Sequence, residues 1–353
     1  MKKLDRHIGL GIFWAFLIVA FVLLGIDFVL TFIDQVKKVN TSFPISSLLE
    51  VLIFRLPGKF TDYIPIASLI GTLIGLGSMA ANSELTVIRA AGIPLWRIGY
   101  SAIKPILLIS AFGMVITEYI APEARQKADL IEKLRNQQDN QFSLTGGVWI
   151  RSEEKFIYIN AADKDGTLYG LQIFTPDGQK LTQISKANTA TPLSNNQWEL
   201  HSTRTTRFLE TSIETTQAQT SVWETSLKPE HLFLAAQEPE SLSLSQSNQY
   251  QSYLERQGLD NTQYKLEFWS KALSPLASIA LVIVALSSVF GPLRSSTMGG
   301  RIFSGVMIGL VFQNGLSLFG KMSLAIGFSP LIGVITPIMI CFIIGLILMR
   351  RVS

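Results

Sequence analysis

Few residues of this 353-residue chain have the types and spacing that catalysis requires. The three histidines, His7, His201 and His231, are scattered, and the single cysteine is Cys341. A zinc site needs clustered Cys and His ligands, and a nucleophile needs a neighbouring base. The sequence therefore predicts no catalytic residue, no metal site and no cofactor.

The segment Gly315–Met322 comes nearest to a nucleotide-binding motif. Gly315, Gly320 and Lys321 have the spacing of a phosphate-binding loop, but Met322 replaces the hydroxyl that holds magnesium. The segment also ends an apolar run, whereas such a loop joins a strand to a helix. We expect no ATP site in this chain.

Charged residues inside or beside the apolar runs are more informative. Asp27 lies inside the first apolar run, and Asp34, Lys37 and Lys38 follow at its end. A charge at membrane depth is costly and normally faces a bundle interior or a polar cavity. Two interpretations remain open from the residues alone. Lys37 and Lys38 attract the phosphates of an anionic lipid, or they extend to the membrane surface and pair with Asp34.

A later apolar run carries two amides, Gln313 and Asn314, between Phe312 and Phe319. Amides at such positions bind across helices or line a passage, and helix packing is the more common use.

Asn82–Gly92 is a short amphipathic segment between two apolar runs. Ser83 can serve as an N-cap, Glu84 places an anion in the first turn, and Gly92 with Pro94 gives a stop signal. These signals predict a helix of about ten residues, which is too short to be stable alone in water. We therefore expect another protein to hold it.

The elements that position these residues are mostly membrane spans. The chain is 48% hydrophobic and 16% charged, below the roughly 25% charged residues of a soluble domain. Runs of about 18 to 20 apolar residues indicate spans. The predicted spans are Ile8–Ile33, Ile64–Ala81, Ile98–Ile120, Phe268–Phe290, Ile302–Phe319 and Pro330–Met349.

Positive residues cluster near the span ends, which indicates membrane topology and not nucleic-acid binding. Six spans place both termini on one side, and the basic flanks there, such as Arg6 and Arg351, make that side cytoplasmic. Lys104, early in the third span, is expected to extend to the membrane surface as a topology marker. The external loop with Arg55 and Lys59 is also basic, which the rule does not explain.

Between the third and fourth spans lies a polar segment with strand-like runs at 147–151, 155–160, 168–174, 198–201, 206–210 and 219–224. Turn signals such as Pro176-Asp-Gly178 separate several of them, and two helical connectors, 123–141 and 245–265, flank the segment. Such strands favour an antiparallel sandwich or jelly roll outside the membrane. The fold class is therefore a membrane protein, an α-helical six-span bundle with an inserted all-β, jelly-roll-like domain. We place the first membrane half at 1–121, the β domain with its connectors at 122–266, and the second half at 267–353.

Several motifs resemble the LptF/LptG family of lipopolysaccharide export permeases, and the match runs to Arg351. These motifs are Leu4-Asp-Arg-His-Ile-Gly9, Phe32-Ile-Asp-Gln-Val-Lys-Lys38, Gly75-Leu-Gly77, Ser83–Gly92, Glu118-Tyr-Ile-Ala-Pro122, Phe268-Trp-Ser-Lys271 and Phe290-Gly-Pro-Leu-Arg-Ser295. The resemblance implies the permease subunit of an ABC exporter in the bacterial inner membrane. Such a subunit extracts lipopolysaccharide and passes it to a periplasmic bridge toward the outer membrane.

The implied partners are an LptF-like permease, two LptB-like ATPase subunits that hydrolyse the ATP, an LptC-like single-span protein, and lipopolysaccharide. The external β domain is then periplasmic. By the same resemblance the 82–92 segment is the coupling helix that docks on the ATPase. The implied coupling residues are Ser83, Glu84, Leu85, Val87, Ile88, Arg89 and Gly92.

The implied lipid-binding residues are Lys37, Lys38 and Asp34, together with Phe312, Gln313 and Phe319 of the fifth span. The first and fifth spans would form the lateral gate and the cavity wall. One departure from the family pattern is Thr31, where related chains carry a further lysine. The alternative function is a non-transporting membrane anchor whose external β domain binds a partner protein.

Overall fold

The computed structural model describes residues 2–37, 39, 44–139, 147–152, 155–178, 180–194, 197–209, 211–225, 227–291 and 297–352. The helices of the first half are α1 (Lys2–Val36), α2 (Ile45–Ala81), α3 (Glu84–Ala90), α4 (Leu95–Val115), the π-helix η1 (Ile116–Ile120) and α5 (Ala121–Asp139). The later helices are α6 (Pro229–Ala236), the 3-10 helix η2 (Pro239–Ser241), α7 (Leu244–Arg256), α8 (Thr262–Ala272), α9 (Ser274–Phe290), α10 (Met298–Ile326) and α11 (Pro330–Val352). The strands are β1 (Val148–Ser152), β2 (Lys155–Ile159), β3 (Ala161–Ala162), β4 (Leu168–Asp177), β5 (Lys180–Ser194), β6 (Gln197–Phe208) and β7 (Ile213–Glu224).

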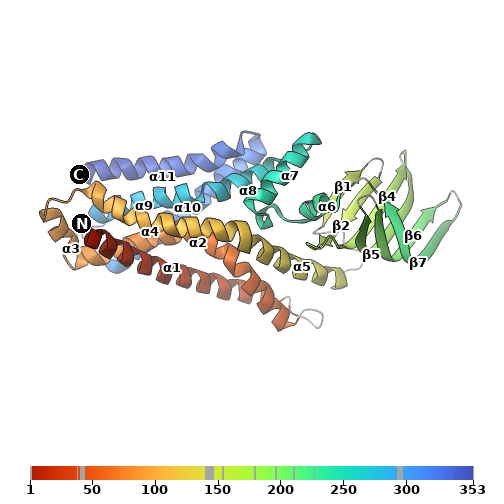
Figure 1. Cartoon of the computed structure of the whole chain (residues 1–353), viewed down its shortest axis with the longest axis horizontal. Coiled ribbons are helices and arrows are strands. Elements are labelled where there is room, and N and C mark those ends of the chain that lie inside the picture. Colours follow the sequence, from red (N-terminus) through yellow and green to blue (C-terminus); the bar gives the residue numbers. More distant parts are fainter. Residues whose placement is uncertain are drawn as a thin grey trace.

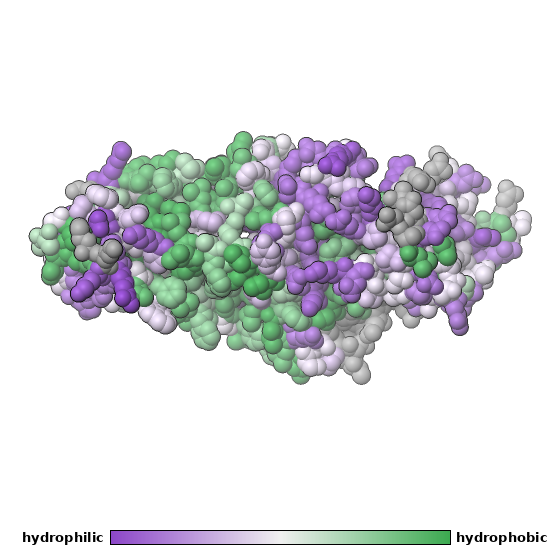
Figure 2. Space-filling view, viewed as in Figure 1, coloured by the Kyte–Doolittle hydropathy of each residue, from purple (hydrophilic) through white to green (hydrophobic). Residues whose placement is uncertain are grey.

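The molecule is elongated, with a helical bundle at one end and the β domain at the other (Figure 1). Both chain ends lie beside α3 at the end of the bundle farthest from the sheet (Figure 1). Within the described residues, five helices are long and apolar enough to cross a membrane, and α8 with α9, bent by 50°, makes a sixth span if counted as one. Figure 2 shows a hydrophobic belt over the middle of the bundle and hydrophilic surface on both sides of it.

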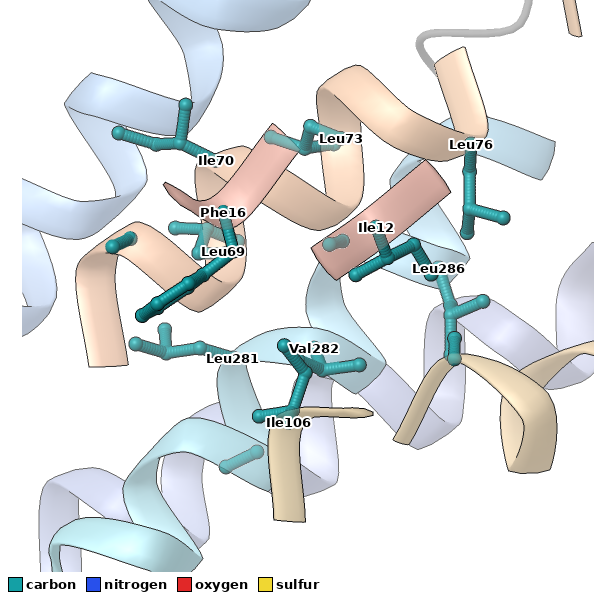
Figure 3. Close-up of a cluster of buried hydrophobic side chains, with 14 of the residues drawn as sticks. Ile12, Phe16, Leu69, Ile70, Leu73, Leu76, Ile106, Leu281, Val282 and Leu286 are labelled. Atoms are coloured by element: carbon teal, nitrogen blue, oxygen red, sulfur yellow. The ribbon is translucent and has the colours of Figure 1, made fainter. Parts of the chain in front are cut away.

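Helix α2 is the centre of the bundle. Of its most apolar stretch 78% is buried, because α1, α4, α9 and α10 surround it. Figure 3 shows apolar side chains of α1, α2, α4 and α9 meeting in one cluster, including Phe16, Leu73, Ile106 and Leu281. A Cβ on Gly71 would lie 2.8 Å from the backbone of Phe16, so α1 and α2 approach closely only because residue 71 is glycine.

The first part of α2 was expected to be a basic external loop, and this expectation is wrong. Helix α2 begins at Ile45, and its residues Leu48, Val51 and Leu52 are buried against Ala128 of α5. This apolar face has helical spacing, but its burial depends on a helix far away in the sequence. The basic residues of this part pair with acids. Arg55 binds Asp129 and Glu132 of α5, and Lys59 binds Asp27 of α1, so acids on neighbouring helices account for the basic residues of this part.

The described strands form one antiparallel sheet in which neighbours follow chain order, β1-β2-β4-β5-β6-β7, with β3 pairing β4. The class of a helical membrane protein with an inserted β domain is confirmed, and the domain uses a single sheet without crossover connections. The longest strand, β5, was missed because its threonines and lysines lack the apolar alternation of a half-buried strand. Helices α6 and α7 cover the core of the sheet, which contains Trp198 and Trp223.

Two connections join the β domain to the bundle. On one side, η1 continues α4 into α5, as the predicted connector 123–141 requires. On the other side, α7 and α8 replace the single predicted connector, because Gly258 takes a positive φ of 67° between them. Glu118 of η1 ties the two connections together, since its carboxylate accepts hydrogen bonds from the backbone N–H groups of Leu244 and Ser245 at the start of α7.

Candidate functional site

The segment predicted to dock on another protein forms helix α3, which has seven residues instead of about ten. Ser83 occupies the N-cap position but takes a left-handed conformation with a φ of 62°, and its side chain accepts no capping hydrogen bond. The predicted Ser83 cap is therefore wrong, because side-chain capping requires an extended backbone at that position. Gly92 ends the segment with a φ of 79°, as its sequence position predicted.

Helix α3 is attached to the bundle along one side only. Leu85 is buried among the core side chains, and Ile88 is partly buried against the same core. On the other side Val87 is 67% exposed and Arg89 is also exposed. The neighbouring Trp96, at the start of α4, is 64% exposed. Exposed apolar side chains at the hydrophilic end of a bundle are typical of a protein docking surface.

Glu84 is held by a contact that the sequence did not suggest. Its carboxylate lies 2.9 Å from Nε2 of His7 on α1. In the same region Asp5 of α1 accepts a hydrogen bond from Ser101 Oγ at 2.8 Å and lies 3.7 Å from Nζ of Lys104. Lys104, which lies inside α4, is thus paired with an acid. The first turns of α1 therefore bind both α3 and α4.

The charged residues in the second half of α1 were expected to act together, but they lie in different surroundings. Asp27 accepts a hydrogen bond from Tyr63 Oη at 2.7 Å and lies 3.3 Å from Nζ of Lys59, so α2 neutralises it. Asp34 and Lys37 are both exposed, and Lys37 lies just beyond the end of α1. Lys38, the other predicted lipid-binding lysine, lies outside the described residues.

The fifth predicted span, α10, lines a partly open cavity of about 250 Å³ near the end of the bundle that faces the β domain. Phe312, which is 4% exposed, and Gln313 both line it, whereas Phe319 does not. Its apolar walls come from α2, α4, α5, α9, α10 and α11 and include Ile64, Pro65, Met114, Leu316, Val334 and Ile338. Ser110 also lines the cavity, and its buried hydroxyl has no hydrogen-bond partner.

One side of this cavity carries charged groups that the sequence analysis did not single out. Nζ of Lys271 donates to the backbone carbonyls of Glu240 at 2.7 Å and Leu242 at 2.6 Å. Arg125 donates to the carbonyl of Glu240 at 2.9 Å and to the Asp62 carboxylate at 2.6 Å. Only the motif Phe268–Lys271 gave a signal for this region. The motif does not predict these contacts, because they form only where α5, η2 and α8 meet in the fold.

The predicted site residues thus fall into separate places. The residues predicted to couple to an ATPase gather at the end with the chain termini, although Leu85 faces the core. Phe312 and Gln313 meet in the cavity, whereas Asp34, Lys37 and Phe319 are not among its lining residues. Within the described chain, no three His, Cys, Asp or Glu side chains are placed to bind a metal ion. The segment 315–322 lies inside α10, where a continuous helix leaves no phosphate-binding loop.

Comparisons with known proteins agree with the resemblance. Residues 6–351 match the sequence model of the family described as lipopolysaccharide export system permease LptF/LptG. The chain is 31% identical over 354 residues to the lipopolysaccharide export system permease protein LptG of Escherichia coli strain K12, covering 99% of this chain and 98% of the relative. It is 30% identical over 342 residues to the LptG protein of Haemophilus influenzae, covering 96% and 95% of the two chains.

Proposed function

Because the chain belongs to the LptF/LptG family of lipopolysaccharide export permeases, we propose that it extracts lipopolysaccharide from the inner membrane and passes it to a periplasmic bridge. It is a permease component without its own ATP site, and a separate ATPase supplies the energy. In this proposal it works with an LptF-like permease, two LptB-like ATPase subunits and an LptC-like single-span protein. The end with α3 and both termini faces the cytoplasm, and the β domain is periplasmic.

The observation that carries the proposal is the separation of a docking end from a lipid end along one bundle. Helix α3 presents Val87 and Arg89 at the hydrophilic end, where a soluble ATPase can reach them. At the opposite end the cavity brings Phe312 and Gln313 together with Arg125 and Lys271. The apolar walls suit a lipid chain. The two cations are balanced by the acids Asp62, Glu240 and Glu267, which also line the cavity. Lys37 adds an exposed cation at the outer end of α1.

Helices α1 and α10 support a lateral gate. Only 17% of the most apolar stretch of each is buried, against 78% for α2. Their exposed side chains include Phe21 and Leu30 of α1 and Phe303 and Val311 of α10. Such surfaces can contact lipid chains or a partner helix and separate again. Because a buried methylene contributes about 0.8 kcal/mol to membrane binding, removing a lipid with several chains requires external work.

The first test is a pull-down in mild detergent at native expression, with mass spectrometry of the captured proteins and lipids. Recovery of a related permease, a soluble ATPase and lipopolysaccharide supports the exporter. Recovery of periplasmic proteins and ordinary phospholipid alone contradicts it and supports the membrane anchor.

The Glu84→Lys variant tests the docking end directly, with Arg351→Glu as a control that reverses an exposed charge beside the C-terminus. We expect Glu84→Lys to reduce ATPase capture and lipopolysaccharide release in nanodiscs. The β domain should stay folded, as followed by tryptophan fluorescence. Normal export by Glu84→Lys would remove Glu84 from the docking surface.

A further inference from the structure

Arg301 lies in the first turns of α10 and is only 3% exposed, although its guanidinium is charged. Its Nη1 donates a hydrogen bond of 2.5 Å to the backbone carbonyl of Gly77, near the end of α2. A carbonyl near a helix C-terminus carries partial negative charge, which favours a cation there. Burial of a guanidinium is unfavourable unless its donors are satisfied, so this contact fixes one helix against the other.

The site for this side chain depends on a glycine. A Cβ on residue 77 would lie 2.9 Å from both Cδ and Nη1 of Arg301. Such a contact is closer than side chains tolerate, so a larger residue at position 77 would displace the guanidinium. Gly77 therefore provides both the acceptor and the space for Arg301.

The close contact between α2 and α10 continues toward the cavity. At four-residue spacing after Arg301, a Cβ on Gly305 would lie 2.6 Å from Leu73, and one on Gly309 would lie 3.1 Å from Ile66. The next buried residue of α10 is Phe312, which lines the cavity. The seam formed by Arg301, Gly305 and Gly309 thus runs from the end of α2 to the cavity wall.

The same end of α2 leads directly into the docking helix. Helix α2 ends at Ala81, and α3 begins at Glu84. A force applied to α3 therefore acts first on the turn of α2 that Arg301 holds. Tightly packed helices move together instead of deforming, because close-packed interiors have few voids.

We propose that Arg301 is a positioning residue that transmits movement of α3 to the cavity wall, by locking the cytoplasmic end of α10 to Gly77 of α2. This inference rests on the proposed export function. Without the Arg301–Gly77 contact, α2 would move with the ATPase, whereas α10, which carries Phe312 and Gln313, would not. The expected defect is ATP hydrolysis without movement of lipid.

The test uses the complete exporter in nanodiscs, with lipopolysaccharide release and ATP hydrolysis measured on the same sample. We expect Arg301→Met to lower lipid released per ATP hydrolysed by at least about fivefold, with hydrolysis near the parent rate. Arg301→Lys should recover part of this ratio, because an ammonium can still donate to the Gly77 carbonyl. Arg351→Met, which removes an exposed cation at the same end, should leave the ratio unchanged.

Gly77→Ala keeps the guanidinium but fills its space, and it protects the test if Arg301→Met assembles poorly. We expect a low ratio for Gly77→Ala as well, and a less than additive loss in the double variant, because both changes act on the Arg301–Gly77 contact. A parent-like ratio in both single variants overturns the inference. A parallel fall of release and hydrolysis also overturns it, since Arg301 would then support assembly alone. Absence of lipid release by the parent complex would instead contradict the proposed function itself.

Discussion

The two ends of the helical bundle are built differently. At the end near the β domain, Lys271 donates to two backbone carbonyls. Asp129 at the same end is 7% exposed and accepts hydrogen bonds from both Arg55 and Ser241. At the end with the termini, α3 buries Leu85 alone and Glu84 meets an exposed His7. Buried charge networks hold elements in one arrangement, whereas exposed pairs contribute little. The end near the β domain is a rigid joint. At the other end α3 alone is weakly held and can be moved by a partner, because the buried Arg301 beside it holds α2 to α10.

Lys271→Met should give the largest effect on the rigid joint. It leaves the carbonyl of Leu242 without its donor and that of Glu240 with Arg125 alone, and it removes one of the two cations near Glu267. We expect the free energy of unfolding in mixed micelles to fall by about 2–4 kcal/mol. Lys265→Met, at a pair with 4.0 Å between Lys265 Nζ and Glu255, is the matched control and should change little. Equal losses in the two variants would mean that the joint is not held by Lys271.

Asp129→Asn should have a smaller effect on the same joint. The amide keeps the shape and can still accept from Ser241, but it weakens the attraction to Arg55, which retains Glu132 at 2.7 Å. We expect a loss of about 1–2 kcal/mol, measured in the same unfolding assay. Glu123→Gln, at an exposed pair with Lys164, serves as the control. A stability equal to that of the parent would show that the ion pair with Glu132 alone is enough to hold Arg55.

The β domain should respond to mild acid through His231. Burial is the main cause that holds the pKa of His231 below its ordinary value of 6.5, and its ring stacks on Tyr253 with centroids 4.0 Å apart. As the pH falls through 6.5, the unfolded chain takes up a proton that the folded chain does not, so stability decreases toward the folded pKa. His231→Phe keeps the stacking and should flatten the decrease in tryptophan-detected unfolding between about pH 7 and 5. Parallel curves for parent and variant would exclude His231 as the cause.

His7→Phe should have the smallest effect on stability and should act only at the end with the chain termini. Because the contact with Glu84 is exposed, we expect no measurable change in unfolding. Loss of the group that orients Glu84 should weaken ATPase binding about two- to fivefold, measured by titration of the reconstituted permease pair. Lys3→Ala, an exposed change on the same helix, is the control. A lower free energy of unfolding for His7→Phe would show that the exposed His7–Glu84 contact also stabilises the fold, contrary to the proposed difference between the two ends.

Local patterns carried much of the information about this protein. Runs such as Pro330–Met349 are apolar over a whole membrane thickness, so their span assignment needs no partner. Gly92 marked the end of α3 and Gly178 the turn between β4 and β5, because each requires a positive φ. The family motifs lie along the whole chain and gave the class of protein before any contact was known.

Other features depended on residues that are distant in the sequence. Strand β5 and the first part of α2 were missed because their stability comes from neighbouring strands and from α5, and not from their own composition. The Arg301–Gly77 contact joins residues 224 positions apart, and the His7–Glu84 contact joins residues 77 positions apart. Hydropathy, turn residues and motifs predicted the membrane class, the inserted β domain and the position of the short helix α3. Which charges are neutralised could not be read from the sequence, since pairing is set by the packing of helices and not by periodicity along the chain.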